Sequence, residues 1–254
     1  MLSDFARRVL PLLGHLEVTG DDPSGPLPGS IVAPNHSSLI DPGVVLAALA
    51  RRGVRNPVVL AAAGLWRIPG LGARLRAEGH IPVHRGEQRA ADALVRAAEA
   101  LADGRVVVIY PEGRLPRRRD SGDRDPEPFR TGLARLALAT GAPVVPVGQT
   151  GARRITSGSR AKQLAGLVTS PLRRPDLRVH FGAPVRLSGT PAEATAQAYA
   201  AVARARRAAA QLAEPMPDAP LPDAPLPNGQ APDGQAPGAP LLSGDLTERA
   251  PAPR

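Results

Sequence analysis

Short apolar runs alternate with longer amphipathic stretches over most of this chain of 254 residues. Each run is bounded by Gly, Pro or charged residues, a pattern typical of strands buried in a sheet. The predicted strands cover residues 30–33, 57–61, 80–83, 105–110, 143–147 and 177–181, with 185–187 as a candidate extension of the sheet. The predicted helices cover 2–16, 41–49, 88–102, 129–140 and 191–213, and a helical region at 65–77 is interrupted by Pro69 and Gly70. Strands that alternate with helices predict an α/β fold, with a mixed, largely parallel central sheet flanked by helices.

Residues 215–254 differ in kind from the rest of the chain, because they repeat Pro-, Ala- and Gly-rich units without apolar periodicity. Such a segment cannot bury enough apolar surface to offset the entropy lost on ordering. We therefore predict one folded domain over residues 1–214, followed by a disordered, solubilising C-terminal tail over residues 215–254.

Composition narrows the function classes. The chain has no cysteine, which excludes disulfides, thiolate metal sites and a cysteine nucleophile, and no cluster of histidines and carboxylates suggests a metal site. The formal charge is +9 overall and −3 in the tail, which leaves +12 on residues 1–214. Anionic lipid, phosphorylated substrates and nucleic acid all favour such a charge, although the scarcity of aromatic residues argues against nucleic-acid binding by base stacking.

The sequence offers no apolar stretch of the roughly 18–20 residues needed to cross a bilayer, and no signal-peptide pattern. We therefore expect a cytoplasmic protein that associates peripherally with the anionic cytoplasmic face of the membrane. Residues 2–16 form an amphipathic pattern that fits either packing on the domain itself or insertion into a membrane surface.

The segment from Asn35 to Asp41 carries the most specific chemistry. It joins a predicted strand to a predicted helix and places His36 in the turn, five residues before Asp41. A turn allows the carboxylate to accept a hydrogen bond from one imidazole nitrogen, which leaves the other nitrogen available as a general base. Taken alone, the pair fits equally well a loop histidine followed by a helix N-cap aspartate.

Two further turns follow predicted strands in the same way, at residues 83–86 and 110–114. Ligands of open α/β sheets bind outside the carboxyl ends of the strands, so we expect the three turns to share one cleft. A histidine base and arginines in that cleft would suit a substrate that carries both a hydroxyl and a phosphate.

Four ordered blocks in the sequence resemble those of the PlsC-like glycerolipid acyltransferase family. The blocks are Asn35-His36 to Asp41, residues 79–85, residues 111–114, and the apolar strand at 144–147. The order and spacing of these blocks are far more specific than any one of them. The third block departs from the family pattern, because Arg114-Leu115 stands where the family has Thr-Arg.

The resemblance implies transfer of a fatty acyl group from an acyl thioester to the hydroxyl of a lysophospholipid, with 1-acyl-sn-glycerol 3-phosphate as the leading acceptor. It implies His36 as the base and Asp41 as its orienting carboxylate. It further implies that substrate contacts come from Asn35, Arg85, Glu112, Gly113 and Arg114, with residues 117–119 as alternatives to Arg114. Acyl-coenzyme A or acyl-acyl carrier protein would be the co-substrate, without a metal or other cofactor.

Three alternatives remain open from the sequence. The same chemistry could serve another acceptor, such as glycerol 3-phosphate, a lyso-amino-lipid or a glycolipid. The protein could instead be a catalytically silent basic protein that binds lipid or nucleic acid. Ser37 or Ser38 could be a hydrolase nucleophile, although the Gly-x-Ser-x-Gly elbow is missing.

If the protein is an acyltransferase, backbone amides of the His36 and Gly113 turns are candidates to stabilise the oxyanion that forms when the thioester carbonyl is attacked.

Overall fold

The computed structural model describes residues 2–23, 25–84, 87–116, 120 and 122–212. Arg85, residues 117–119 and the tail predicted over 215–254 lie outside the described residues.

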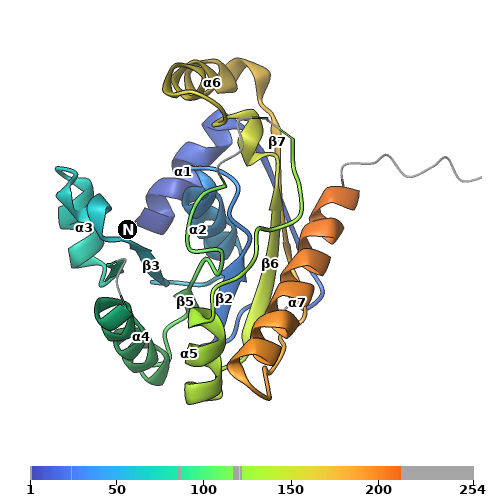
Figure 1. Ribbon diagram of the computed structural model, residues 1–254. Helices are drawn as coiled ribbons and strands as arrows, with labels where there is room; N and C mark the ends of the chain where they lie inside the picture. Colours follow the sequence, from blue (N-terminus) through green and yellow to red (C-terminus); the bar gives the residue numbers. More distant parts are fainter. Residues whose placement is uncertain (1, 24, 85–86, 117–119, 121, 213–254) are drawn as a thin grey trace, which may run out of the picture. The chain divides into compact units, whose positions relative to one another are not determined.

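The described residues form a seven-stranded sheet with the order β1-β7-β6-β2-β5-β3-β4 (Figure 1). The strands are β1 His15–Gly20, β2 Ile31–Pro34, β3 Val58–Ala62, β4 Ile81–Val83, β5 Val107–Val108, β6 Val144–Thr150 and β7 Asp176–Phe181. Neighbouring strands are parallel except at the β6–β7 pair. The prediction of a mixed, largely parallel sheet within an α/β fold is therefore confirmed.

Helices lie on both faces of the sheet. They are α1 Leu2–Leu13, α2 Asp41–Arg51, α3 Leu71–Ala77, α4 Glu87–Ala102, α5 Gly132–Thr140, α6 Arg160–Arg173 and α7 Pro191–Gln211, with short 3₁₀ turns η1 Ala63–Arg67 and η2 Ala152–Arg154. Gly141 ends α5 in the left-handed conformation, as expected for a glycine that stops a helix.

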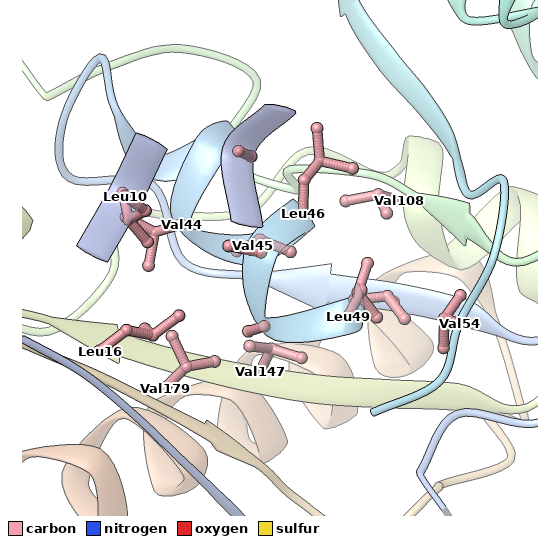
Figure 2. Packing of buried hydrophobic residues seen from close by; sticks show 14 of the residues in the cluster. Leu10, Leu16, Val44, Val45, Leu46, Leu49, Val54, Val108, Val147 and Val179 are labelled. Carbon is pink, nitrogen blue, oxygen red and sulfur yellow. The ribbon is translucent and has the colours of Figure 1, made fainter. Parts of the chain in front are cut away.

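Alternation along the central strands divides the core into two layers. Val32 of β2 points to the face that α1 and α2 cover, whereas Ile31 and Ala33 point to the face covered by α4, α5 and α7. Figure 2 shows the first layer, where Val44, Val45 and Leu49 of α2 lie over the sheet. Because both faces of β2 and β6 are buried, these strands fix the position of the turns that follow them.

Several elements differ from the sequence prediction. The helix predicted over 2–16 ends at Leu13, and His15–Gly20 forms strand β1 beside β7. Gly14 makes this change possible, because a Cβ there would lie 2.5 Å from the carbonyl oxygen of Pro175. Helix α6 was not predicted. The candidate extension at 185–187 reduces to a single bridge between Val185 and Val144.

Candidate active site

The loop from Asn35 to Ile40, which we call the catalytic turn, leaves the carboxyl end of β2 and is attached to β6. The side chain of Asn35 accepts a hydrogen bond from the amide of Gln149 at 2.7 Å and donates to its carbonyl at 3.2 Å. The side chain of Gln149 in turn donates to the carbonyl of Asn35 at 2.6 Å. All of these groups are buried, so the pairing extends the sheet by side-chain contacts beyond the last β2–β6 register pair.

Asp41 organises the turn from the first residue of α2. Its fully buried carboxylate accepts hydrogen bonds from the amides of Ser37 and Ser38, the second at 2.7 Å, and lies 3.3 Å from Ser37 Oγ. The N-cap position belongs to Ile40, which makes no side-chain cap. Asp41 therefore binds the amides that precede the helix, and the N-cap alternative is wrong.

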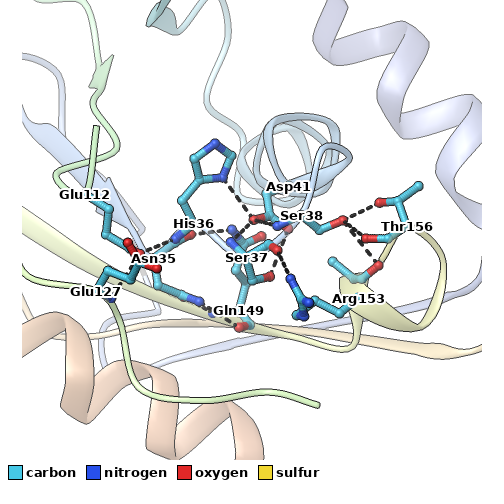
Figure 3. A network of polar contacts seen from close by, with 11 residues as sticks. Asn35, His36, Ser37, Ser38, Asp41, Glu112, Glu127, Gln149, Arg153 and Thr156 are labelled. Carbon is cyan, nitrogen blue, oxygen red and sulfur yellow. Dashed lines mark hydrogen bonds and ion pairs between the residues drawn. The ribbon is translucent and has the colours of Figure 1, made fainter. Parts of the chain in front are cut away.

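His36 completes the pair that the sequence predicts. Its Nδ1 lies 3.1 Å from Asp41 Oδ2 (Figure 3). Its ring stacks at a tilt on Tyr110 with the centroids 4.4 Å apart. The carboxylate favours the tautomer with the proton on Nδ1, which leaves a lone pair on Nε2. Within the described residues Nε2 has no hydrogen-bond partner, and the side chain is 16% exposed. A substrate hydroxyl can therefore reach this nitrogen.

Glu112 reaches the catalytic turn from the end of β5. Its carboxylate accepts hydrogen bonds from the amide of His36 at 2.6 Å and from the amide of Glu127 at 3.0 Å. Burial raises the pKa of Glu112 from 4.5 to about 7, and the two amide hydrogen bonds oppose that rise. Glu112 thus holds the backbone of His36, while Asp41 holds its ring.

A second support lies on the far side of the turn and was missed by the sequence analysis. The buried guanidinium of Arg153 donates to the carbonyl of Ser37 at 2.7 Å and also to the carbonyl of Asp120. The Ser38 hydroxyl bonds the carbonyl of Thr156 at 3.0 Å. Both serines are buried and engaged in this way, which argues against either of them as a hydrolase nucleophile.

Comparison of the chain with known proteins identifies its family. A profile of the acyltransferase family matches residues 15–150, which is more than half of the chain and includes the whole catalytic turn. The chain belongs to the acyltransferase family. The resemblance to PlsC-like proteins seen in the four sequence blocks is therefore confirmed.

Two relatives of this acyltransferase-family chain define the likeness further. A 1-acyl-sn-glycerol-3-phosphate acyltransferase of Borreliella burgdorferi is 33% identical over 131 residues, which make up 51% of this chain and 49% of that protein. The chain thus matches about half the length of this curated relative. The crystal structure of the 1-acyl-sn-glycerophosphate (LPA) acyltransferase PlsC from Thermotoga maritima has a TM-score of 0.63 at 21% identity, covering 85% of this chain and 80% of that one. The second match shows the shared fold.

The structure brings together only some of the residues that the family resemblance implies. His36, Asp41 and Glu112 form one hydrogen-bonded group, and Asn35, next to His36, is bonded to Gln149 (Figure 3). Arg114 is half-exposed and pairs with Glu127 at 3.5 Å, and Glu127 is the residue whose amide binds Glu112. The placement of Arg85 is not described, so its role stays a prediction.

The amides expected to stabilise an oxyanion are already occupied. The His36 amide binds Glu112, those of Ser37 and Ser38 bind Asp41, and that of Gly113 donates to the carbonyl of Tyr110 at 3.0 Å. Gly113 has a φ of 69°, which suits glycine in a tight turn, and a Cβ there would lie 2.9 Å from Arg130 Cδ. Its contact with substrate in this acyltransferase-family chain stays a prediction. In the described part of the chain, no group of three or more His, Cys, Asp or Glu residues could hold a metal ion.

Proposed function

We propose that this protein transfers a fatty acyl group from an acyl thioester to the free hydroxyl of 1-acyl-sn-glycerol 3-phosphate, which yields phosphatidic acid for phospholipid biosynthesis. Membership of the acyltransferase family supports acyl transfer as the reaction, and the name of the Borreliella relative supports the acceptor. One observation carries the proposal above the others. It is the His36–Asp41 pair, with Nδ1 bound to the carboxylate and Nε2 open.

The proposed reaction needs no acyl-enzyme. Nε2 of His36 takes the proton of the acceptor hydroxyl as its oxygen attacks the thioester carbonyl, and the ester bond forms as the carbon–sulfur bond breaks. The departing thiolate then takes the proton from the imidazolium, which returns His36 to its starting state. Throughout, the buried carboxylate of Asp41 stabilises the imidazolium and keeps the ring oriented.

The supports of the catalytic turn suit this mechanism. A general base works only when its nitrogen is held within hydrogen-bond reach of the hydroxyl, and small displacements reduce the rate steeply. Here Glu112 fixes the His36 backbone, and Asp41 fixes both the ring and the two following amides. In this proposal Glu112 is a positioning residue rather than a ligand of the substrate.

In this proposal, arginine side chains bind the phosphate of the acceptor. Arg85 and Arg114 are the candidates, with the third block's departure from the family pattern leaving residues 117–119 as alternatives. A phosphate near Arg114 would compete with Glu127 for the guanidinium, which their 3.5 Å exposed pairing allows at little cost. Acyl-coenzyme A or acyl-acyl carrier protein is the proposed donor, and no other cofactor takes part.

The proposed place of action is the cytoplasmic surface of a membrane, because a lysophospholipid acceptor resides there. No helix in the described part of the chain has the length and hydrophobicity of a bilayer span. Peripheral attachment through an anionic lipid surface fits the formal charge of +9.

The experiment that tests the proposed function is a competition among acceptors. Purified protein is incubated with equal concentrations of 1-acyl-sn-glycerol 3-phosphate, glycerol 3-phosphate, a lyso-amino-lipid and a lyso-glycolipid, with either donor, and products are identified by mass spectrometry. We expect phosphatidic acid to dominate and to disappear with His36→Ala. A dominant product from another acceptor would move the assignment to that lipid, and no product with either donor would refute acyl transfer.

A further inference from the structure

Helix α6 is almost entirely exposed, although more than half of its residues are apolar or small. Of its residues only Ser170 is buried, and the side chains of Leu164, Val168 and Leu172 are 64%, 68% and 90% exposed. These three lie four residues apart and therefore share one side of the helix. We call them the α6 stripe. Large exposed apolar groups in such a row are unusual in a protein that has no partner for them.

The opposite side of α6 attaches the helix to the domain. Gly166 lies against the backbone, since a Cβ there would lie 2.1 Å from the carbonyl oxygen of Ile155. Ser170, one turn later, is fully buried and donates to the carbonyl of Leu167 at 2.8 Å. Residues two positions apart are separated by ~200° around a helix, so Val168 points away from the side that Gly166 packs. The attachment therefore directs the α6 stripe outward.

The charge on α6 itself has one sign, while Asp4 of α1 and Asp176 beyond Arg174 are acidic residues farther along the chain from it. Arg160, Lys162 and Arg173 of α6 and Arg174 directly after it are exposed, and α6 contains no Asp or Glu. The neighbouring helix α1 adds exposed Arg7 and Arg8, and Arg174 joins the two helices through Nη2, 3.5 Å from the carbonyl of Pro11. An apolar row within a basic surface is complementary to a bilayer that contains anionic lipid.

The helix is linked to the catalytic turn by a short path. The Ser38 hydroxyl bonds the carbonyl of Thr156, and α6 begins only a few residues later at Arg160. Leu39, next to Ser38 in the catalytic turn, is itself 59% exposed. A surface that held α6 at the lipid interface would therefore hold the turn that carries His36 close to the same interface.

We propose that the α6 stripe is a docking surface for anionic phospholipid bilayers, and that it brings the catalytic turn to lipid acceptors that stay in the membrane. The proposal rests on the proposed function for its purpose, while the docking itself can be measured without turnover. A second copy of the chain suits the stripe less well. Two α6 helices packed face to face would bring their basic residues together without an acidic residue on either helix to pair with them.

The test uses full-length protein and sedimentation with vesicles of neutral phosphatidylcholine, with or without a third of anionic phosphatidylglycerol. Wild type should bind the anionic vesicles and lose binding as salt rises. The variant Leu164→Ser/Val168→Ser/Leu172→Ser should bind about tenfold or more weakly, because its apolar contacts with the interface are removed. Its melting temperature should not fall, since all three side chains are exposed.

A matched pair of single variants separates docking from a general effect of charge. Val168→Asp should weaken vesicle binding several-fold, whereas Val95→Asp on α4, where Val95 is 59% exposed, should leave it within twofold of wild type. Equal losses in the two variants, or wild-type binding by the triple variant, would overturn the proposal. A concentration-dependent dimer that the triple variant abolishes, with no change in vesicle binding, would assign the stripe to a second copy.

Turnover measurements then distinguish failure of the docking surface from failure of the proposed function. Acceptors with acyl chains short enough to remain monomeric in water should be acylated equally by wild type and the triple variant. Acceptors embedded in anionic vesicles should be acylated at least about tenfold more slowly by the variant. Stripe-dependent binding without any acyl transfer would refute the proposed function alone, and transfer at equal rates in vesicles would refute the docking surface alone.

Discussion

Among the histidine–carboxylate pairs of the described residues, those of His36 and His80 lie at opposite ends of the sheet, and of these two only His36 is arranged as a base. His36 follows β2 at its carboxyl end, whereas His80 precedes β4 at its amino end. Nδ1 of His80 accepts a hydrogen bond from the amide of Val59 at 3.0 Å, and its Nε2 lies 3.5 Å from Glu78. Both nitrogens of His80 thus face protein groups, and the side chain is 2% exposed.

The comparison shows that proximity to a carboxylate does not by itself leave a histidine nitrogen available to act as a base. Burial is the main influence on His80 and lowers its pKa, although the charge of Glu78 opposes the change. His36 keeps one nitrogen open, and its carboxylate partner is fixed by backbone amides. The availability of Nε2 and the support of Asp41 are therefore the features that experiments should remove one at a time.

The largest effect is expected from removing the base itself. His36→Ala should lower kcat by about 10²–10⁴ with acyl-coenzyme A and a monomeric lyso-lipid acceptor, because general-base catalysis contributes on that order. Steady-state kinetics measure the loss, and circular dichroism should show an unchanged fold. If folded His36→Ala protein turns over at the wild-type rate, the pair at the carboxyl end has no catalytic role.

A smaller loss is expected from Asp41→Asn, which keeps the shape of the side chain but not its charge. The amide would place an N–H group where Oδ2 now accepts from Ser38, so the ring would lose its orientation and the imidazolium its stabilisation. We expect kcat to fall toward the lower end of the range of about 10²–10⁴ that general-base catalysis contributes, with a lower melting temperature. Asp103→Asn, at an exposed position after α4, serves as the matched control and should change neither quantity.

The third prediction concerns the support of the His36 backbone. The pKa of Glu112 is about 7 in the folded protein and 4.5 in the unfolded chain, so folding favours the protonated carboxyl. Its contribution to stability is complete below pH 4.5 and is lost as the pH rises through 7. Relative to Glu112→Gln, the free energy of unfolding of wild type should fall by up to about 3 kcal/mol over this window. Urea unfolding at several pH values measures this difference, and parallel curves for the two proteins would contradict it.

The smallest effect is expected from replacing His80, at the amino end of β4. His80→Ala leaves the amide of Val59 without its acceptor, which should cost about 1–3 kcal/mol of unfolding free energy. Turnover per folded molecule should equal that of wild type. His80→Asn offers a replacement acceptor and should recover part of the stability. Loss of turnover in folded His80→Ala protein would show that the two pairs are coupled.

Much of the fold follows from apolar patterning, while the missed elements lack that signal. Strand β1 is an edge strand beside β7, it is only partly buried, and it contains polar residues. The amphipathic pattern of the preceding helix also continues into the first residues of β1, which hides the start of the strand. Helix α6 contains Gly166 and Pro171 and buries almost nothing, so it shows no amphipathic face directed at a core. The order of the strands could not be predicted from the sequence either, because strand pairing depends on contacts between distant segments.

The candidate site likewise has contacts that the sequence predicts and contacts that it does not. The spacing of His36 and Asp41 predicts their contact because both lie within one turn. Arg153 could not be found, because an arginine among other basic residues gives no sign that it will be buried against the carbonyl of Ser37, 116 residues earlier. Glu112 was identified, but its contact with the His36 amide depends on the placement of β5 beside β2.

The pairing of Asn35 with Gln149 determines when the candidate active site can form during folding. The two residues are 114 positions apart, and the catalytic turn is anchored only when β6 has been added to β2. Contacts between distant segments form late, because the intervening chain must first lose much of its freedom. A chain still being synthesised therefore cannot complete the site before Gln149 has emerged. On refolding, enzymatic competence should return with the slowest structural phase, after most of the helix signal has recovered.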